Sequence, residues 1–352
     1  KGNGLCFACI IMSSKDGEQL AIKIFHAAKV MEIKDIYMHR CLRLAENGRL
    51  SAPPNPMVGA VIVYKDRIIG EGYHAKCGQA HAEVNAIASV RPEDRPHLQD
   101  STLYVSLEPC AHYGRTPPCA RLILNTGIPR VVVGCEDPFD KVEGRGITML
   151  RDGGVQVTVG VLEQECRELN RHFFTFHTKH RPYITLKWAS SADGFVDSWR
   201  EDEAAAPVKL SNAHSLMDVH RLRAYHQAIL VGHGTLKADR PQLNVRDWVG
   251  SNPQRLVLGH VGEDELPVGF TAYADVATLL QSLTEQGVQS LLVEGGPQTQ
   301  RAFIERGLWD EAIEELSPLT LGSGVPAPHL PVGIPRKVTT HWGHTLTTWR
   351  NS

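Results

Sequence analysis

Apolar residues along the first half of the chain predict a layered domain of alternating strands and helices. Apolar runs of strand length alternate with segments whose apolar residues recur at helical spacing, and glycine or proline separates them. A hairpin followed by helix, strand, helix and strand is typical of an α/β fold. The predicted elements are a helix at 36–48, strands at 60–64, 67–74, 102–107 and 130–134, and helices that begin near residues 82 and 120.

The alternation continues after residues 180–182, which we interpret as a seam between two parts of the chain. A short strand at 155–159 and a helix from about Glu163 precede this seam. Ser211 is predicted to cap the first helix of the second part. The repeated strand–helix units predict a second, doubly wound α/β domain. Its predicted strands are 183–189, 227–232, 255–258 and 290–294, and its predicted helices are 211–222, 276–283 and 298–306.

Length and cysteine distribution indicate how the chain divides. A chain of 352 residues has room for about two domains. All 8 cysteines lie at or before Cys166, which suggests two halves of different character. We therefore predict an extension outside the fold at 1–35, a first domain at 36–180 and a second domain at 181–352. Met31 lies near the end of the extension and is a candidate for the natural start of the protein.

Charge and cysteine spacing narrow the classes of partner. The formal net charge of −2 provides no basic field for a nucleic-acid backbone, so no nucleic-acid partner is expected. The apolar run at 5–12 is too short to span a membrane, and it lacks the small-residue cleavage site of a signal peptide. Cys6 and Cys9 have the spacing of half a zinc site, but no second pair follows them. The other cysteines show no disulfide framework, which points to a reducing, cytoplasmic setting.

The strongest candidates for a catalytic site are His81 and Glu83 and, downstream, Cys110 and Cys119. One histidine and two cysteines are three ligands, the number that a catalytic zinc ion keeps when water takes the fourth position. Zinc deaminases combine such ligands with a non-ligand glutamate two residues after the histidine, which moves protons. The alternative is that the cysteines are buried structural residues, because free cysteine packs like a small apolar side chain. The predicted order of elements favours zinc, since the histidine begins a helix and Cys110 follows a buried strand.

Three further features leave alternatives open. Asn55 lies in a proline-rich loop, where it is either a rigid amide donor to a substrate or part of an ordinary Asx-turn. Residues 293–297 (Val-Glu-Gly-Gly-Pro) would suit a phosphate at a helix N-terminus, although their spacing alone favours a plain tight turn. The Gly-His-Gly at 232–234 lacks the rest of a dinucleotide-binding fingerprint.

Several motifs taken together resemble one family. Pro-Asn-Pro-x-Val-Gly, Gly-Tyr-His, His-Ala-Glu, Leu-Glu-Pro-Cys and His-x-Gly-Arg-Thr-Pro-Pro-Cys are similar to the bifunctional deaminase/reductase family of bacterial riboflavin biosynthesis. The resemblance extends from about residue 36 to about residue 328. It implies a cytidine-deaminase-like, three-layer first domain. It also implies that His81, Cys110 and Cys119 bind zinc, that Glu83 is the proton shuttle, and that Asn55, His74 and residues 112–115 line the substrate pocket.

Motifs after residue 180 resemble the reductase half of the same family. They include Leu-Lys-x-Ala-x-Ser-x-Asp-Gly at 186–194 and Val-Glu-Gly-Gly-Pro at 293–297. The resemblance implies a dihydrofolate-reductase-like α/β domain that uses NADPH. The implied cofactor contacts are Ala189, Thr235, Asp239 and Gly296, and the implied substrate contacts are Arg223, Leu243, Arg246 and Glu294. The two arginines would suit a ribose phosphate, because guanidinium groups bind phosphate through two parallel hydrogen bonds.

The second half also departs from the family pattern. Lys209 and Gly259 differ from the usual residues, and the run 259–275 is shorter than its counterpart. We expect this shortening to remove a strand from the cofactor edge and to weaken NADPH binding.

The sequence therefore predicts a bifunctional riboflavin-biosynthesis enzyme. Its first activity would be zinc-dependent deamination of 2,5-diamino-6-ribosylamino-4(3H)-pyrimidinone 5′-phosphate. Its second would be NADPH-dependent reduction of 5-amino-6-(5-phosphoribosylamino)uracil to the ribityl product. The alternatives are an active deaminase with an impaired reductase domain and a non-catalytic, zinc-dependent interaction module. A homo-oligomer, either dimer or tetramer, is expected.

Overall fold

The computed structural model describes residues 33–112, 117–139, 144–200, 206–262 and 264–351. Most of the predicted extension at 1–35 lies outside these residues, as do residues 113–115 of the segment expected to line the substrate pocket.

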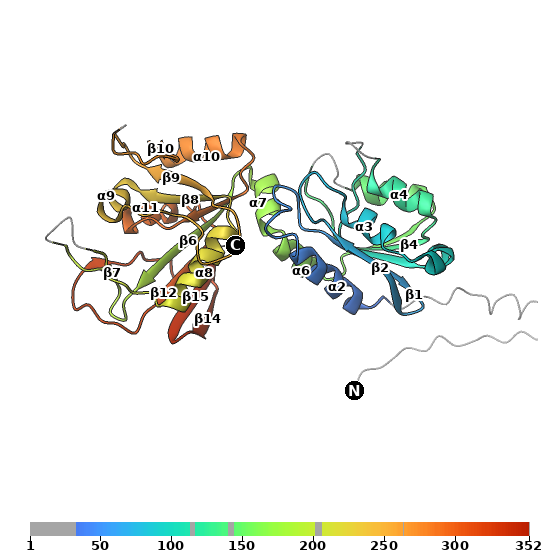
Figure 1. Ribbon diagram of the computed structural model, residues 1–352, viewed down its shortest axis with the longest axis horizontal. Coiled ribbons are helices and arrows are strands. Elements are labelled where there is room, and N and C mark those ends of the chain that lie inside the picture. Colours follow the sequence, from blue (N-terminus) through green and yellow to red (C-terminus); the bar gives the residue numbers. More distant parts are fainter. Residues whose placement is uncertain (1–32, 113–116, 140–143, 201–205, 263, 352) are drawn as a thin grey trace, which may run out of the picture. The chain divides into compact units, whose positions relative to one another are not determined.

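The first part of the chain forms a five-stranded mixed sheet (Figure 1). Its strands are β1 (Gly59–Tyr64), β2 (Arg67–Tyr73), β3 (Thr102–Leu107), β4 (Arg130–Cys135) and β5 (Gln156–Val159). They lie in the order β2-β1-β3-β4-β5. β1 pairs antiparallel with β2 and β3, whereas β3, β4 and β5 are parallel. The predicted hairpin and the strands that follow it are confirmed.

Helices cover both faces of this sheet, so the domain has three layers. The helices are α2 (Asp35–Glu46), α3 (Ala82–Ala88), the 3-10 helix η1 (Pro92–Asp100), α4 (Cys119–Thr126), α5 (Arg145–Asp152), α6 (Glu163–Leu169) and α7 (Arg171–Lys179). Side chains alternate across a strand, and Ile62 accordingly packs with α3, α4 and α5, while Val61 packs with α2, α6 and α7. The helix predicted from Glu163 is divided at Asn170, which separates α6 from α7.

The second part of the chain is built on an eight-stranded sheet in the order β10-β9-β8-β11-β6-β12-β15-β14. The first six strands in this order are parallel to one another. Strand β15 is antiparallel to β12, and β14 is antiparallel to β15. The strands are β6 (Tyr183–Ser190), β8 (Ala228–Gly232), β9 (Gln254–Leu258), β10 (Phe270–Tyr273), β11 (Ser290–Val293), β12 (Glu311–Leu316), β14 (Arg336–His341) and β15 (His344–Arg350). The helices are α8 (Ala213–Ala224), α9 (His233–Asp239), α10 (Val276–Glu285) and α11 (Pro297–Ile304), and β7 (Phe195–Asp197) pairs separately with β13 (Val325–Pro326).

The predicted cap of the first helix in this part is wrong. Asn212, not Ser211, caps α8, and its side-chain oxygen accepts hydrogen bonds from the backbone N–H groups of His214 and Ser215, both at 3.0 Å. The hydroxyl of Ser211 instead donates to Glu315 at 2.6 Å. Serine and asparagine cap helices about equally well, so local sequence could not distinguish these two neighbours. In the structure the Glu315 carboxylate binds Ser211, and Asn212 caps the helix.

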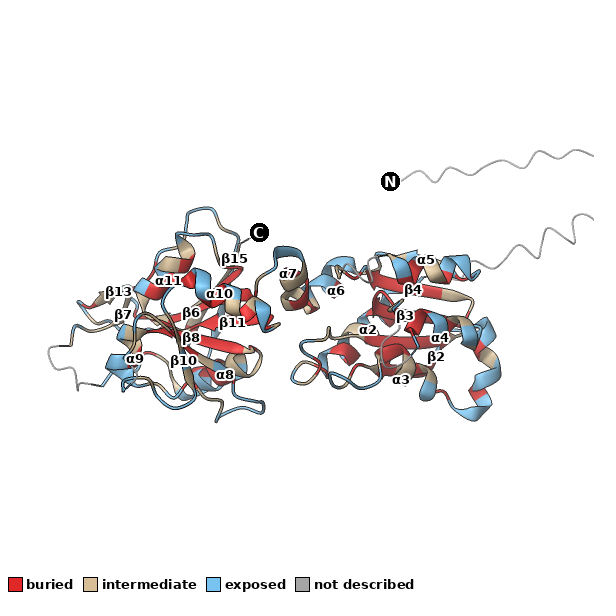
Figure 2. Ribbon diagram, turned by 90° about the horizontal axis from the view of Figure 1, so that it is seen from above, coloured by how far each residue is buried: buried red, intermediate tan, exposed pale blue. Residues whose placement is uncertain are grey.

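The central strands are the most deeply buried elements of both sheets (Figure 2). Every residue of β3, β8 and β11 is buried. Each of these strands is followed directly by a segment that contains candidate site residues, namely 108–110, 233–235 and 294–296. Rigid strands therefore position both candidate sites. Within the described residues, no helix combines the length and the apolar character needed to cross a bilayer.

We expect Ile123→Ala to destabilise the first domain by about 2–5 kcal/mol, because it would leave a cavity in the core. Ile123 is fully buried on α4, the helix that begins at Cys119. Arg121→Ala on the exposed side of the same helix is the control and should change stability by less than about 0.5 kcal/mol. Urea unfolding measures both variants, and equal effects would contradict the assignment of this face to the core.

Candidate functional site

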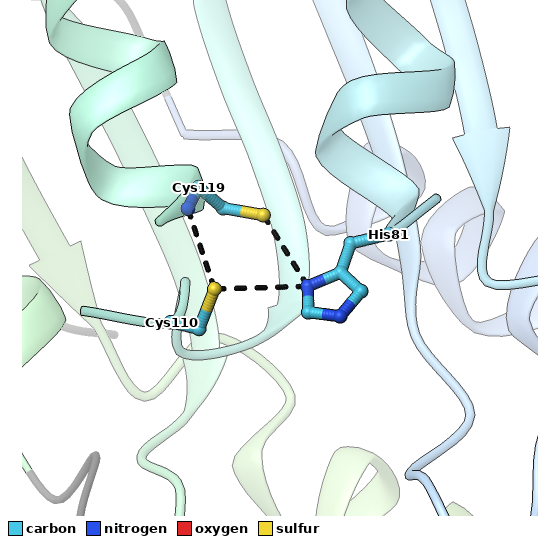
Figure 3. Close-up of side chains that lie close together, drawn as sticks. All are labelled: His81, Cys110 and Cys119. Atoms are coloured by element: carbon cyan, nitrogen blue, oxygen red, sulfur yellow. Dashed lines mark hydrogen bonds between the residues drawn. The ribbon is translucent and has the colours of Figure 1, made fainter. Parts of the chain in front are cut away.

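Three elements bring His81, Cys110 and Cys119 together (Figure 3). His81 is the N-cap of α3, with extended backbone angles. Cys119 is the first residue of α4, directly after Pro118. Cys110 lies three residues after the end of β3. The structure thus brings the three predicted ligands together at the end of a strand and at the starts of two helices.

The spacing of the three donor atoms suits a zinc ion. The Nδ1 atom of His81 lies 3.4 Å from the Sγ of Cys119 and 3.7 Å from the Sγ of Cys110, and all three donor atoms lie within 4.8 Å of one another. Tetrahedral zinc with its usual bond lengths places nitrogen and sulfur ligands about 3.5 Å apart. One imidazole and two thiols are also ligand types that zinc prefers. The donor set therefore fits the ion in both chemistry and distance.

The first turn of α4 favours a negatively charged sulfur. The backbone N–H of Cys119 donates to the Sγ of Cys110 at 3.3 Å. Hydrogen bonds from the Cys119 side chain and then from His81 lower the pKa of Cys110 to about 4. The bond with Cys110 raises the pKa of Cys119. Thus the pair holds a thiolate at neutral pH, and thiolate is the form in which cysteine binds a metal.

Glu83 lies beside the three donors and is almost completely buried. It is the second residue of α3 and only 3% exposed. Burial raises the pKa of Glu83 to about 7, although the nearby His81 acts in the opposite direction. A carboxyl group whose pKa lies near the working pH can both accept and return a proton.

Asn55 and His74 form a second polar group next to the donors. The Nδ2 of Asn55 lies 3.1 Å from the Nε2 of His74, and the Nδ1 of His74 lies 3.0 Å from the carbonyl oxygen of Ala80. Burial lowers the pKa of His74, so its ring is neutral, with Nδ1–H donating to Ala80 and Nε2 accepting from Asn55. The rings of His74 and His81 meet edge to face, 5.3 Å apart. The structure thus brings together the four predicted deaminase residues and the two predicted substrate contacts.

A cavity of about 630 Å³ in the second part of the chain gathers most of the other predicted residues. Its lining includes Ala189, Thr235, Asp239, Gly296 and Glu294. The hydroxyl of Thr235 accepts a hydrogen bond from the backbone N–H of Gly296 at 3.0 Å, which joins α9 to the start of α11. That N–H was a candidate phosphate donor, and here a side chain of the protein occupies it.

The predicted substrate residues of this part are divided in space. Arg223 donates to both carboxylate oxygens of Glu294, at 2.6 and 3.1 Å, and both side chains are largely buried. Leu243 is 2% exposed and belongs to a core cluster. Arg246 donates to Asn244 at 3.1 Å. Of these predicted substrate residues only Glu294 lines the cavity, and Arg223 reaches it through Glu294.

The shortened run 259–275 contains regular structure. Strand β10 (Phe270–Tyr273) lies within it and forms the sheet edge beside β9, so the run still contributes a strand to the sheet. Residues of the run line a different cavity of about 670 Å³, together with parts of α9. Gly259 has a φ of 124°, a conformation that disfavours side chains, which explains glycine at this position.

Lys187, Gln300 and Arg200 are among the residues of the 630 Å³ cavity to which the sequence assigned no role. Lys187 lies two positions before Ala189 on β6, and its ammonium group is 3.5 Å from Glu315. Gln300 on α11 donates to the carbonyl oxygens of Lys187 and Gly295, each at 3.0 Å. Arg200 binds Asp239 at 2.7 Å. The two-residue repeat of a strand could have identified Lys187 from Ala189, whereas the other two depend on contacts between distant segments.

Comparisons with known proteins match both parts of the chain to known domains. Residues 31–135 match the cytidine and deoxycytidylate deaminase zinc-binding region, and residues 182–341 match the RibD C-terminal domain. The riboflavin biosynthesis protein RibD of Aquifex aeolicus is 36% identical over 84% of this chain and 90% of that protein. RibD of Chlamydia pneumoniae is 41% identical over 81% of this chain and 85% of that protein.

The chain belongs to the RibD family.

Solved structures of RibD proteins share its fold. Acinetobacter baumannii RibD has 32% sequence identity and a TM-score of 0.79, with 90% of this chain and 98% of that chain covered. The deaminase/reductase of Thermotoga maritima has 34% identity, the same TM-score and the same coverage. The expected combination of a cytidine-deaminase-like domain with a dihydrofolate-reductase-like RibD C-terminal domain is therefore confirmed.

We expect this RibD chain to bind about one zinc ion, and Cys110→Ser and Cys119→Ser each to lose it, because two remaining ligands bind zinc weakly. Cys77→Ser is the matched control, since Cys77 is an exposed free cysteine of the same domain. Metal analysis of the purified proteins measures the outcome. Full zinc content in either ligand variant would remove that cysteine from the ligand set.

Proposed function

We propose that this RibD protein catalyses two successive steps of riboflavin biosynthesis. The first domain deaminates 2,5-diamino-6-ribosylamino-4(3H)-pyrimidinone 5′-phosphate by hydrolysis. The second reduces 5-amino-6-(5-phosphoribosylamino)uracil to its ribityl derivative with NADPH. The observation that carries the proposal is the convergence of His81, Cys110 and Cys119 beside the buried Glu83. Membership of the RibD family and the presence of both domains support it.

In the deaminase site, His81, Cys110 and Cys119 would hold the zinc ion, which when bound makes water acidic enough to supply hydroxide near neutral pH. Glu83 would take one proton from the attacking water and pass it to the ring nitrogen, and it would then carry the second proton of that water to the leaving amine. Its raised pKa suits both transfers. Water adds to the ring carbon, the exocyclic C–N bond breaks, and ammonia leaves.

Asn55 would orient the pyrimidine. Because one N–H of its Nδ2 is donated to His74, the amide is fixed in one orientation, and its second N–H would donate to the substrate. The proline-rich loop reduces the freedom of Asn55 further. His74 therefore acts through Asn55 as well as lining the pocket.

In the reductase site, Ala189, Thr235, Asp239 and Gly296 would contact NADPH, which supplies the hydride. These residues line one cavity, as a single extended cofactor requires. Glu294 would face the substrate from the same cavity, held by Arg223. Leu243 and Arg246 would complete the substrate side, where Arg246 can reach a phosphate because it is exposed.

We also propose a cytoplasmic location and a homo-oligomeric state, either dimer or tetramer. The six cysteines of the described residues are all free, which suits a reducing compartment. All six residues of β14, at the edge of the large sheet, are exposed. Such an edge is suited to pairing with another chain.

Glu83→Gln is expected to keep zinc but to lower deamination roughly 10²–10⁴-fold, because the amide cannot relay the proton. A two-stage assay with the pyrimidine substrate first and NADPH second tests this, with ammonia release and NADPH oxidation followed separately. Reduction of the supplied deaminated product should be unchanged, which makes the second domain an internal control. Deamination within a few-fold of the parent would assign the base elsewhere, and a parent protein without turnover would favour an interaction module.

Thr235→Val is expected to weaken NADPH binding about five- to tenfold, because the loss of one hydrogen bond costs about 1 kcal/mol. Valine keeps the shape of threonine but has no hydroxyl to donate to the cofactor or to accept from Gly296. Val268→Ser is the control, since Val268 is 96% exposed within the shortened run. Fluorescence titration measures both variants. Equal weakening in both would show that the run contributes to the cofactor site.

A further inference from the structure

Glu108 lies between β3 and Cys110, and it is 4% exposed. Its carboxylate accepts four backbone hydrogen bonds. Oε1 accepts from Gly146 at 2.8 Å and from Ile147 at 3.2 Å, and Oε2 accepts from Gly144 at 3.0 Å and from Asp137 at 3.3 Å. Both oxygens are therefore fully engaged with the segment that follows β4.

Three of these donors belong to the N-terminal turn of α5. The first N–H groups of a helix have no partner within the helix, and a side chain at the N-cap usually accepts from them. The N-cap of α5 is Gly144, which has no side chain. Glu108, which follows β3, supplies the missing cap instead. Its negative charge also suits the positive end of the helix.

The backbone on either side of this carboxylate is fixed as well. The N–H of Glu108 donates to the carbonyl oxygen of Cys135 at 3.0 Å. A Cβ atom at Gly146 would overlap the carbonyl oxygen of Pro109, so the strand end packs directly on α5. Pro109 has a ring-restricted backbone and is followed by Cys110. Little freedom therefore separates the anchored Glu108 from the sulfur of Cys110.

We propose that Glu108 is a positioning residue for zinc, which holds Cys110 in its ligating position by anchoring the end of β3 to α5. This inference rests on the zinc site of the proposed function. Metal ligands need support from surrounding groups, because small displacements of one donor atom weaken binding. A purely structural Glu108 would stabilise the domain without affecting how long zinc stays bound.

Glu108→Gln tests the role with little change in shape. Its amide keeps one acceptor oxygen but turns an N–H₂ group toward backbone N–H donors. Zinc release to a chelator, measured by a colorimetric indicator, should be roughly 10- to 100-fold faster than in the parent. Asp94→Asn is the matched control, because Asp94 is a buried acid of the same domain that binds Arg67. Release at the parental rate in Glu108→Gln, or equal acceleration in Asp94→Asn, would overturn the proposal.

Cys110→Ser in the same experiment separates this proposal from the zinc site itself. Zinc retained by Cys110→Ser would show that the ligand set is wrong. Zinc lost by Cys110→Ser but held at the parental rate by Glu108→Gln would refute only the positioning role.

Hydrogen exchange of the parent protein gives a test that needs no variant. Coupling between two sites is reciprocal, so removing zinc should speed exchange at the amides of Gly146 and Ile147. Amides at the far end of the β1–β2 hairpin, at Val63 and Ile68, should keep their rates. Unchanged exchange at Gly146 and Ile147 would overturn the proposal. Equal acceleration at the hairpin would do so too, since zinc would then support the whole domain.

Discussion

The deaminase half depends on holding two sulfur atoms near one imidazole nitrogen, at the 3.4 and 3.7 Å separations that suit a tetrahedral zinc ion. Two thiolates in one place repel each other, so the fold must supply compensating groups. The start of α4 does so, because its first N–H points at the Sγ of Cys110. His81 begins α3, and Cys119 begins α4. Each donor therefore stands at the end of a rigid element, where the backbone is held by the sheet and the side chain is free to reach the ion.

Two buried glutamates next to this centre have different surroundings. Glu83 lies among the ligand side chains, where burial raises its pKa to about 7, so it suits proton transfer. Glu108 accepts four backbone N–H groups, which suits a fixed anchor. The proposed roles, proton transfer for Glu83 and anchoring for Glu108, therefore follow from the number of donors that surround each carboxylate.

The reductase half follows a similar plan with different groups. The buried strands β8 and β11 end side by side, and the bond between Thr235 and Gly296 joins the segments that follow them. Arg223 and Glu294 form a largely buried ion pair at the same end of the sheet. A buried charge without its partner is costly, so each member of this pair fixes the position of the other. Both active sites of this RibD protein therefore lie just beyond strand ends that belong to the cores.

The sequence alone predicted most of the strands and helices and the three candidate zinc donors, because apolar periodicity and ligand spacing are local properties of the chain. It did not determine β14 or β15, whose residues lack a clear apolar alternation, nor that Asn212 rather than Ser211 caps α8. The sequence also did not predict that Arg223 pairs with Glu294 or that Glu108 binds the start of α5. Each of these joins residues that are tens of positions apart, and the geometry of such a contact exists only once the sheets have formed. Local pattern decided which groups are available, and tertiary structure decided which of them meet.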